Sequence, residues 1–113
     1  MLSRRYRFHG YGSLRKVYNH SQNVRGSLIG LRFAQRPPGK PFRVAVVVAR
    51  KVHKSAVKRN RIRRRVYEAV RRSQYLPKET DLILTVFNEQ VGTMPTRDLD
   101  KQVNELLQKA ATK

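Results

Sequence analysis

The residues best suited to chemistry in this sequence are basic side chains, crowded into the segment from Lys54 to Arg72. This segment holds nine Lys or Arg and a single acid, Glu68. Guanidinium groups at this density suit phosphates, which they bind through paired hydrogen bonds. A merely solvated helix face mixes charges of both signs, and like charges four residues apart, such as Arg61 and Arg65, weaken a helix. The segment therefore predicts a surface for a polyanion, with nucleic acid as the favoured partner.

No set of side chains typical of a catalytic centre or a metal site accompanies the basic segment. The chain has no cysteine, so thiolate ligands and disulfides are excluded. His9, His20 and His53 lack ligand spacing to one another or to acids, so we expect no metal site. No Ser–His–Asp set is visible, and paired carboxylates are absent from the basic region. We expect the chain to bind rather than to catalyse, with His53 meeting phosphate.

The charge of the whole chain supports a polyanionic partner. The formal net charge is +19 over 113 residues. Such a charge opposes compaction unless a partner neutralises it, and binding through phosphates weakens steeply with salt. Residues 1–77 hold 21 Lys or Arg and one acid, whereas residues 78–113 hold five bases and six acids. The N-terminal two-thirds is therefore expected to carry the binding surface.

A membrane role is not indicated. The longest apolar run, Val44–Ala49, has six residues, far fewer than a bilayer span requires. The basic start MLSRRYRFHG lacks a following apolar region, so it does not read as a secretory signal. We expect a cytoplasmic protein with no membrane partner.

The apolar residues of the basic segment recur at helical spacing. Ile62, Val66, Ala69 and Val70 fall within about a third of a helical wheel, which predicts a stripe that packs on a core. Arg59 lies beside this stripe, and we expect it to reach past the edge of a sheet near the start of the helix. The polar residues are expected opposite the stripe, at Asn60, Arg64, Tyr67 and Arg71, and along a flank, at Arg61, Arg65, Glu68 and Arg72.

The other elements follow from apolar spacing and from turn-forming residues. Gly26 and Gly30 are the points where the first strand can bend. The continuous run VAVVVA in the second strand indicates burial on both faces and a central position in the sheet. The expected elements are a short helix from Ser13 to about His20, strands over Val24–Gln35, Phe42–Ala49 and Asp81–Phe87, and a helix from Thr96 to about Lys109.

These elements predict an α/β (α+β) two-layer sandwich, in which helices pack on a sheet. The length suits one modest core, so residues 1–113 are expected to form a single RNA-binding domain. Residues 1–12 are expected to be a basic, irregular start, and residues 110–113 a frayed tail.

Several segments resemble one known family in the same order. Lys58–Arg64, KRNRIRR, resembles the RNR signature of the bacterial ribonuclease P protein component. Arg43–Lys51, RVAVVVARK, is similar to the buried strand of that family and its terminal basic pair. Ser13–His20 is similar to its first helix, and Asp81–Phe87 to its last strand. The resemblance covers nearly the whole chain, and its specific part is the block from Arg43 to Arg64.

The resemblance implies a fold like the second domain of ribosomal protein S5, in the order helix–strand–strand–strand–helix–strand–helix, with the basic helix as a crossover. It implies a ribonuclease P subunit, which binds a catalytic RNA and helps it remove the 5′ leader of precursor tRNA. The partners would be this catalytic RNA and precursor tRNA, with one protein monomer per RNA. The endonucleolytic reaction would belong to the RNA and its Mg²⁺ ions, with no catalytic residue in the protein.

The resemblance also assigns two sets of contact residues. A cleft between the first helix and the sheet would hold the leader through Leu14, Tyr18 and Phe33, although Phe33 also reads as a core residue. The family usually carries two Phe on the first helix, where this chain has Leu14 and Tyr18; Tyr18 can stack on a base, and Leu14 offers only apolar contact. The residues expected to contact the catalytic RNA are Arg50, Lys51, Lys54, Lys58, Arg59, Asn60, Arg61, Arg63, Arg64 and Arg65.

Two alternatives use the same basic helix. A ribosomal protein or a general RNA chaperone would bind RNA without belonging to an enzyme, but the RNR block together with the short first helix argues against it. A DNA-binding protein could read adenine through Asn60. However, no helix-turn-helix, zinc finger or zipper surrounds the helix.

Overall fold

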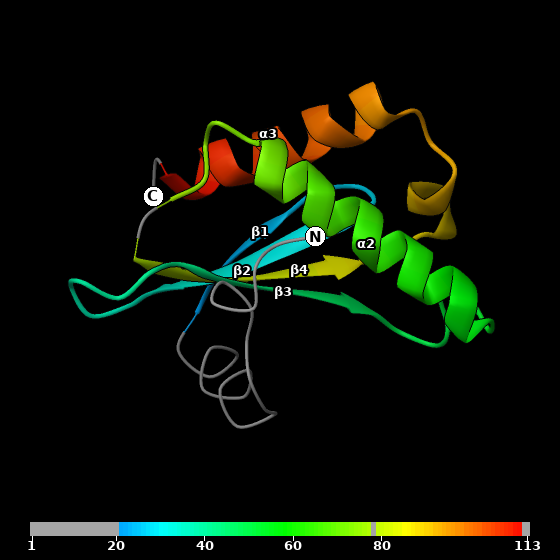
Figure 1. Ribbon diagram of the computed structural model, residues 1–113, viewed down its shortest axis with the longest axis horizontal. Coiled ribbons are helices and arrows are strands. Elements are labelled where there is room, and N and C mark those ends of the chain that lie inside the picture. Colours follow the sequence, from blue (N-terminus) through cyan, green and yellow to red (C-terminus); the bar gives the residue numbers. More distant parts are fainter. Residues whose placement is uncertain (1–20, 78, 112–113) are drawn as a thin grey trace.

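The computed structural model describes residues 21–77 and 79–111, in which two helices cover one face of a four-stranded sheet (Figure 1). This arrangement confirms the predicted two-layer sandwich. The short helix expected at Ser13–His20 and the irregular start lie outside the described residues. The elements are β1 (Gln22–Arg25), β2 (Ile29–Gln35), β3 (Arg43–Val48), α2 (Ala56–Arg72), β4 (Thr80–Val86), the 3-10 helix η2 (Glu89–Gly92) and α3 (Thr96–Ala111).

The sheet has the order β1-β2-β4-β3. Its β1–β2 and β2–β4 pairs are antiparallel, and its β3–β4 pair is parallel, joined by α2 as the predicted crossover. The segment expected as one strand over Val24–Gln35 is a hairpin that turns at Gly26, whose N–H donates to the Ile29 carbonyl at 2.9 Å. A Cβ at Gly26 would lie 2.7 Å from that oxygen, so the tight turn requires glycine. Gly30, the other expected bend, lies inside β2.

The position of β3 differs from the prediction, because this strand lies at the edge of the sheet rather than at its centre. Its apolar run is explained by burial on both faces: Val44, Val46 and Val48 join the main core, and Ala45 packs on the opposite face. The apolar pattern reports what covers the two faces of a strand and says nothing about how many strands flank it. The edge is covered at one point, where the Val46 N–H donates to the hydroxyl oxygen of Tyr67 at 3.2 Å. Tyr67 is therefore half-buried against β3, and not on the outer side of α2 as predicted.

The main core lies between the sheet and the two helices. The predicted stripe of α2 is buried, with every member at 2% exposure or less: Ile62, Val66, Ala69 and Val70. The stripe of α3 is buried with it, at Leu99, Val103, Leu106, Leu107 and Ala110. The frayed tail expected from residue 110 is therefore wrong for Ala110, which is in the core, and for Ala111, which ends α3; residues 112–113 lie outside the described part.

The face of the sheet that α2 and α3 do not cover carries a second, smaller apolar cluster around Ala45 and Ile83. We call this side the open face. Alternation along β2 points Ile29, Leu31 and Phe33 the other way, into the main core. Phe33 is only 9% exposed. This burial argues against its expected contact with the leader and supports its reading as a core residue.

Candidate nucleic-acid interface

The start of α2 is built to leave positive charge exposed. Ser55 is the N-cap, and its side-chain oxygen accepts a hydrogen bond from the Lys58 backbone N–H at 3.3 Å. The Ser55 N–H in turn donates to His53 Nδ1 at 3.0 Å. The first turn of α2 contains no acidic residue, so the positive end of the helix dipole is not offset by a carboxylate from its own first turn. This end of the helix is therefore suited to an anion supplied from outside.

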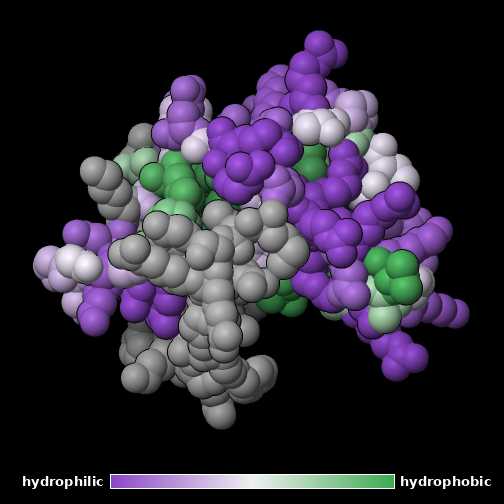
Figure 2. Space-filling view, in the orientation of Figure 1, coloured by the Kyte–Doolittle hydropathy of each residue, from purple (hydrophilic) through white to green (hydrophobic). Residues whose placement is uncertain are grey.

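Basic side chains extend the positive end over the neighbouring surface. Arg61 and Arg64 are exposed, and in the part of the chain that the structure describes neither side chain makes a hydrogen bond or an ion pair. Figure 2 shows hydrophilic side chains over much of the outward side of α2. We call this region the basic surface; its exposed residues are Arg50, Lys51, Lys54, Lys58, Asn60, Arg61 and Arg64.

Two further residues of the predicted RNA-binding set are partly occupied by local contacts. Arg59 lies near the start of α2, as expected, but folds back: its Nη1 donates to the carbonyls of His53 and Lys54 at 2.8 and 2.9 Å. Arg63 donates to the side-chain oxygen of Asn60. These bonds fix the loop before the helix and orient the Asn60 amide, so both arginines position the basic surface as well as adding charge to it.

Arg65 lines one hollow together with Arg61 and Arg64, but unlike them it is held by backbone carbonyls. Its Nη1 donates to the Val91 carbonyl at 2.7 Å and its Nη2 to the Met94 carbonyl at 2.5 Å. These carbonyls belong to η2 and to the turn that follows it. Arg65 therefore ties α2 to the segment before α3, which leaves fewer of its N–H groups for RNA; its expected contact with RNA stays a prediction. A helical wheel gives the direction of a side chain but not the backbone that lies there.

The last turns of α2 carry basic residues with acidic partners. Arg71 forms an ion pair with Glu68 at 2.8 Å, and Arg72 forms one with Asp100 of α3 at the same distance. The hydrogen bond from Arg72 to Asp100 raises the pKa of this guanidinium above its ordinary value. Positive charge at this end is thus neutralised by the fold, and the basic surface is confined to the first half of α2 and the loop before it.

A cavity of about 270 Å³ separates the basic surface from η2. His53 Nε2 lies 3.9 Å from a Glu89 oxygen beside it, so His53 faces a carboxylate on one side. Among residues 21–77 and 79–111, no three His, Asp or Glu side chains come together as a metal site. The cavity is lined by His53, Lys58, Arg61, Ile62, Glu89, Gln90, Gly92 and Thr93.

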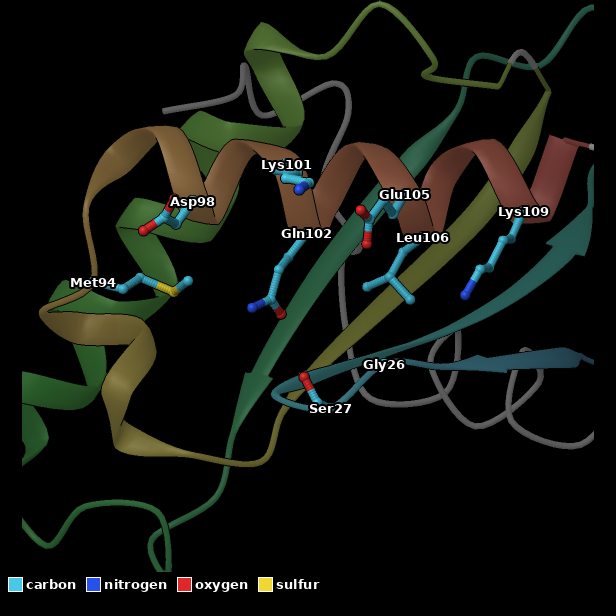
Figure 3. Close-up of a pocket in the computed structure, with 9 residues that line it drawn as sticks. All are labelled: Gly26, Ser27, Met94, Asp98, Lys101, Gln102, Glu105, Leu106 and Lys109. Carbon is cyan, nitrogen blue, oxygen red and sulfur yellow. The ribbon is translucent and has the colours of Figure 1, made fainter.

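A second hollow lies between α3 and the β1–β2 turn (Figure 3), with a volume of about 420 Å³. Its charged residues alternate in sign along α3: Asp98, Lys101, Glu105 and Lys109. Because the charges balance, this groove is poorly suited to phosphate.

None of the helices in the described part of the chain is both long and apolar enough to cross a bilayer.

Comparison with known proteins agrees with this geometry. The model of the ribonuclease P family matches residues 2–111. A ribonuclease P protein component of Synechococcus sp. (strain JA-2-3B'a(2-13)) is 34% identical over 113 residues, covering 97% of this chain and 85% of the relative. A second, from Synechococcus sp. (strain RCC307), is 35% identical over 85 residues, covering 66% of this chain and 67% of the relative.

Solved structures show the same fold. The RNase P protein of Staphylococcus aureus has a TM-score of 0.77 at 20% identity, covering 93% of this chain and 94% of that one. The protein of Thermotoga maritima has a TM-score of 0.74 at 20% identity, covering 85% and 89%. The basic surface, the fold and the family match together place this chain in the ribonuclease P protein family, the RNA-binding protein subunits of the ribonucleoprotein that processes the 5′ end of tRNA.

Proposed function

We propose that the protein is a non-catalytic subunit that binds the catalytic RNA of ribonuclease P through the basic surface, as one monomer per RNA in the cytoplasm. The observation that carries this proposal is the contrast in charge along α2. Arg61 and Arg64 make no ion pair with any described residue, whereas Arg71 and Arg72 have acidic partners. Guanidinium groups that no carboxylate neutralises are free to bind phosphate through charge-assisted hydrogen bonds.

In this proposal the chemistry stays with the RNA. The Mg²⁺ ions that activate water and stabilise the leaving oxygen would be held by phosphates of the catalytic RNA. The protein's own part is to bind phosphates and reduce their repulsion as the catalytic RNA folds around precursor tRNA. The expected consequence is a lower Mg²⁺ requirement for cleavage.

The precursor is the second proposed ligand, with its 5′ leader lying over the open face of the sheet. Two of the three residues first expected to contact it, Leu14 and Tyr18, lie outside the described residues. The third, Phe33, lies in the main core, as described above. The open face supplies an alternative set of side chains, which we consider in the next subsection.

Reconstitution with a bacterial ribonuclease P RNA and precursor tRNA tests this function. The protein alone is expected to cleave nothing, and its addition is expected to lower the Mg²⁺ concentration at which the RNA cleaves at the mature 5′ end. Cleavage by the protein alone at a normal rate, or no effect on the Mg²⁺ requirement, would contradict the proposal.

A ribosomal protein or general RNA chaperone would use the same basic surface, since phosphate binding does not select one RNA. Sequencing the RNA that co-purifies with the protein separates the two functions. We expect ribonuclease P RNA to be the most enriched species relative to its abundance. Enrichment of ribosomal RNA alone would favour the alternative.

A further inference from the structure

Phe87 is a large apolar residue that the fold leaves partly exposed to solvent. It directly follows β4 and is 40% exposed. Alternation along β4 directs Val86 into the main core and Phe87 to the open face. The Phe87 N–H donates to the Leu28 carbonyl at 2.8 Å, which holds its backbone against the β1–β2 turn. The ring is thus presented from a fixed point rather than from a loose loop.

Contacts with the sheet also fix the position of the Phe87 ring. A Cβ on Gly30 would meet two ring atoms at 2.8 and 3.0 Å, so the ring occupies space that only glycine leaves. Arg25 pairs with Gly30 across the β1–β2 ladder, and its guanidinium carbon lies 4.7 Å from the ring centroid. At that distance the cation is attracted to the ring face. We call these three residues, Arg25, Gly30 and Phe87, the aromatic stack.

The open face around the aromatic stack is basic. Asp81 is buried, and Arg43 and Arg36 lie 2.7 and 3.5 Å from it. Arg32, in the row next to Gly30, is a further base on this face. Among the described residues, Arg25, Arg32, Arg36 and Arg43 thus bring four positive charges to this face, around the carboxylate of Asp81. Two other large apolar side chains of the described residues are exposed, Val57 and Tyr75, but neither lies on the open face.

Single-stranded nucleic acid binds to sites that combine an exposed aromatic ring, a guanidinium plane and surrounding positive charge. Bases stack on aromatic rings and on guanidinium planes, and nearby cations bind the backbone. A duplex cannot use such a site, because the faces of its bases are already stacked on one another. The apolar area of Phe87 left in water is thus explained if a base covers it.

We propose that the aromatic stack binds a nucleobase of single-stranded RNA, with Phe87 and Arg25 supplying the stacking surface and Arg25 also reaching a neighbouring phosphate. This inference rests on the proposed function in one respect: in the assembled enzyme the strand would be the 5′ leader of precursor tRNA. Phe87 would then supply the aromatic contact on the sheet for which Phe33, buried in the main core, is unsuited.

The absence of tryptophan from the chain provides a direct test. Phe87→Trp places a single indole in the stack, and Tyr75→Trp places one at a comparably exposed position away from the open face. Each variant is titrated with a short single-stranded oligoadenylate and with an abasic strand of equal length, while anisotropy of a labelled strand reports binding.

We expect oligoadenylate to quench the indole fluorescence of the Phe87→Trp variant and the abasic strand to quench it far less. In the Tyr75→Trp variant, neither strand should cause more than slight quenching. Equal quenching of the Phe87→Trp variant by both strands would mean a charge effect and overturn the proposal. It would also be overturned if that variant stayed unquenched at saturating RNA, if a duplex quenched it equally, or if the unsubstituted protein failed to bind oligoadenylate at low salt.

A second experiment separates this inference from the proposed function. In the reconstituted enzyme, Phe87→Ala and Gly30→Ala are expected to raise the KM for precursor with a leader roughly tenfold, the size of one lost stacking contact. Binding of the catalytic RNA is expected to stay unchanged. Gly30→Ala keeps both the ring and the charge, so it tests position alone. An unchanged KM in both variants would overturn the stack, whereas a wild-type protein that fails to bind the catalytic RNA would overturn the proposed function instead.

Discussion

The two halves of α2 are both rich in arginine, yet the fold uses them differently. In the first half, Arg61 and Arg64 point into solvent without an acidic partner among the described residues. In the second half, Arg65 binds two backbone carbonyls, and Arg72 pairs with Asp100. The difference comes from the partners within reach: the carbonyls of Val91 and Met94 accept from Arg65, and the carboxylate of Asp100 pairs with Arg72.

This contrast shows that the number of basic residues in a segment overstates its binding surface. A guanidinium that already donates to backbone carbonyls has fewer N–H groups left for phosphate and cannot leave without exposing unsatisfied acceptors. The helix is therefore divided between ligand binding and structure, at about Arg65. Each half can be tested by removing charge from it.

The largest effect is expected from the first half. Replacing Lys58, Arg61 and Arg64 together with Ala should lower the affinity for ribonuclease P RNA by roughly 150-fold at 0.15 M salt, if each contacts one phosphate. The measurement is filter binding or anisotropy, with circular dichroism to confirm that α2 remains folded. A loss below tenfold would mean that the basic surface is not the main RNA contact.

Arg65→Ala tests the boundary between the two halves. The carbonyls of Val91 and Met94 lose a charged donor, so we expect the free energy of unfolding to fall by about 2 kcal/mol in urea denaturation. Affinity of the folded variant for RNA should fall less than in a matched Arg64→Ala control. The reverse order, a stable Arg65 variant with a large loss of affinity, would return Arg65 to the RNA-binding set.

Tyr67→Phe tests whether the middle of α2 holds the edge of the sheet. The variant removes the acceptor for the Val46 N–H while keeping the ring, so we expect a loss of about 1 kcal/mol in the free energy of unfolding. Affinity for RNA is expected to stay the same. Lower RNA affinity at unchanged stability would instead favour the outward position predicted from the helical wheel.

The smallest effect is expected at the C-terminal end of α2. Arg72→Ala breaks a partly exposed ion pair with Asp100, which is expected to cost about 0.5 kcal/mol of stability. RNA affinity should change less than twofold, since this charge is already neutralised. A loss comparable to that of Arg61→Ala would remove the distinction between the halves.

Much of the fold could be predicted from local patterns. Apolar spacing in α2, α3 and β2 predicts the residues that the structure buries, because spacing alone determines which side chains share a face. The edge position of β3 could not be predicted in this way, since strand order depends on pairing between distant segments. The turn at Gly26 was one of two possible bends, and only the close approach to the Ile29 carbonyl selects it.

The candidate site was predictable in composition and less so in detail. The basic surface follows from the density of Lys and Arg, but the roles of Arg59 and Arg65 depend on carbonyls that loop folding brings to them. The sequence around Phe33 fits either a core residue or a leader contact, and its position in β2 places it in the core. The placement of the Phe87 ring could not be predicted from the sequence around it. That placement depends on the space left by Gly30, which is 57 positions earlier in the chain.

The most direct test of the division of α2 is the salt dependence of RNA binding for two matched double variants. Arg61→Gln with Arg64→Gln, and Arg71→Gln with Arg72→Gln, each remove two positive charges from the same helix. We expect the slope of log affinity against log salt to fall by about 2 in the first variant and to stay near that of the unsubstituted protein in the second. Equal reductions in the two slopes would contradict the division.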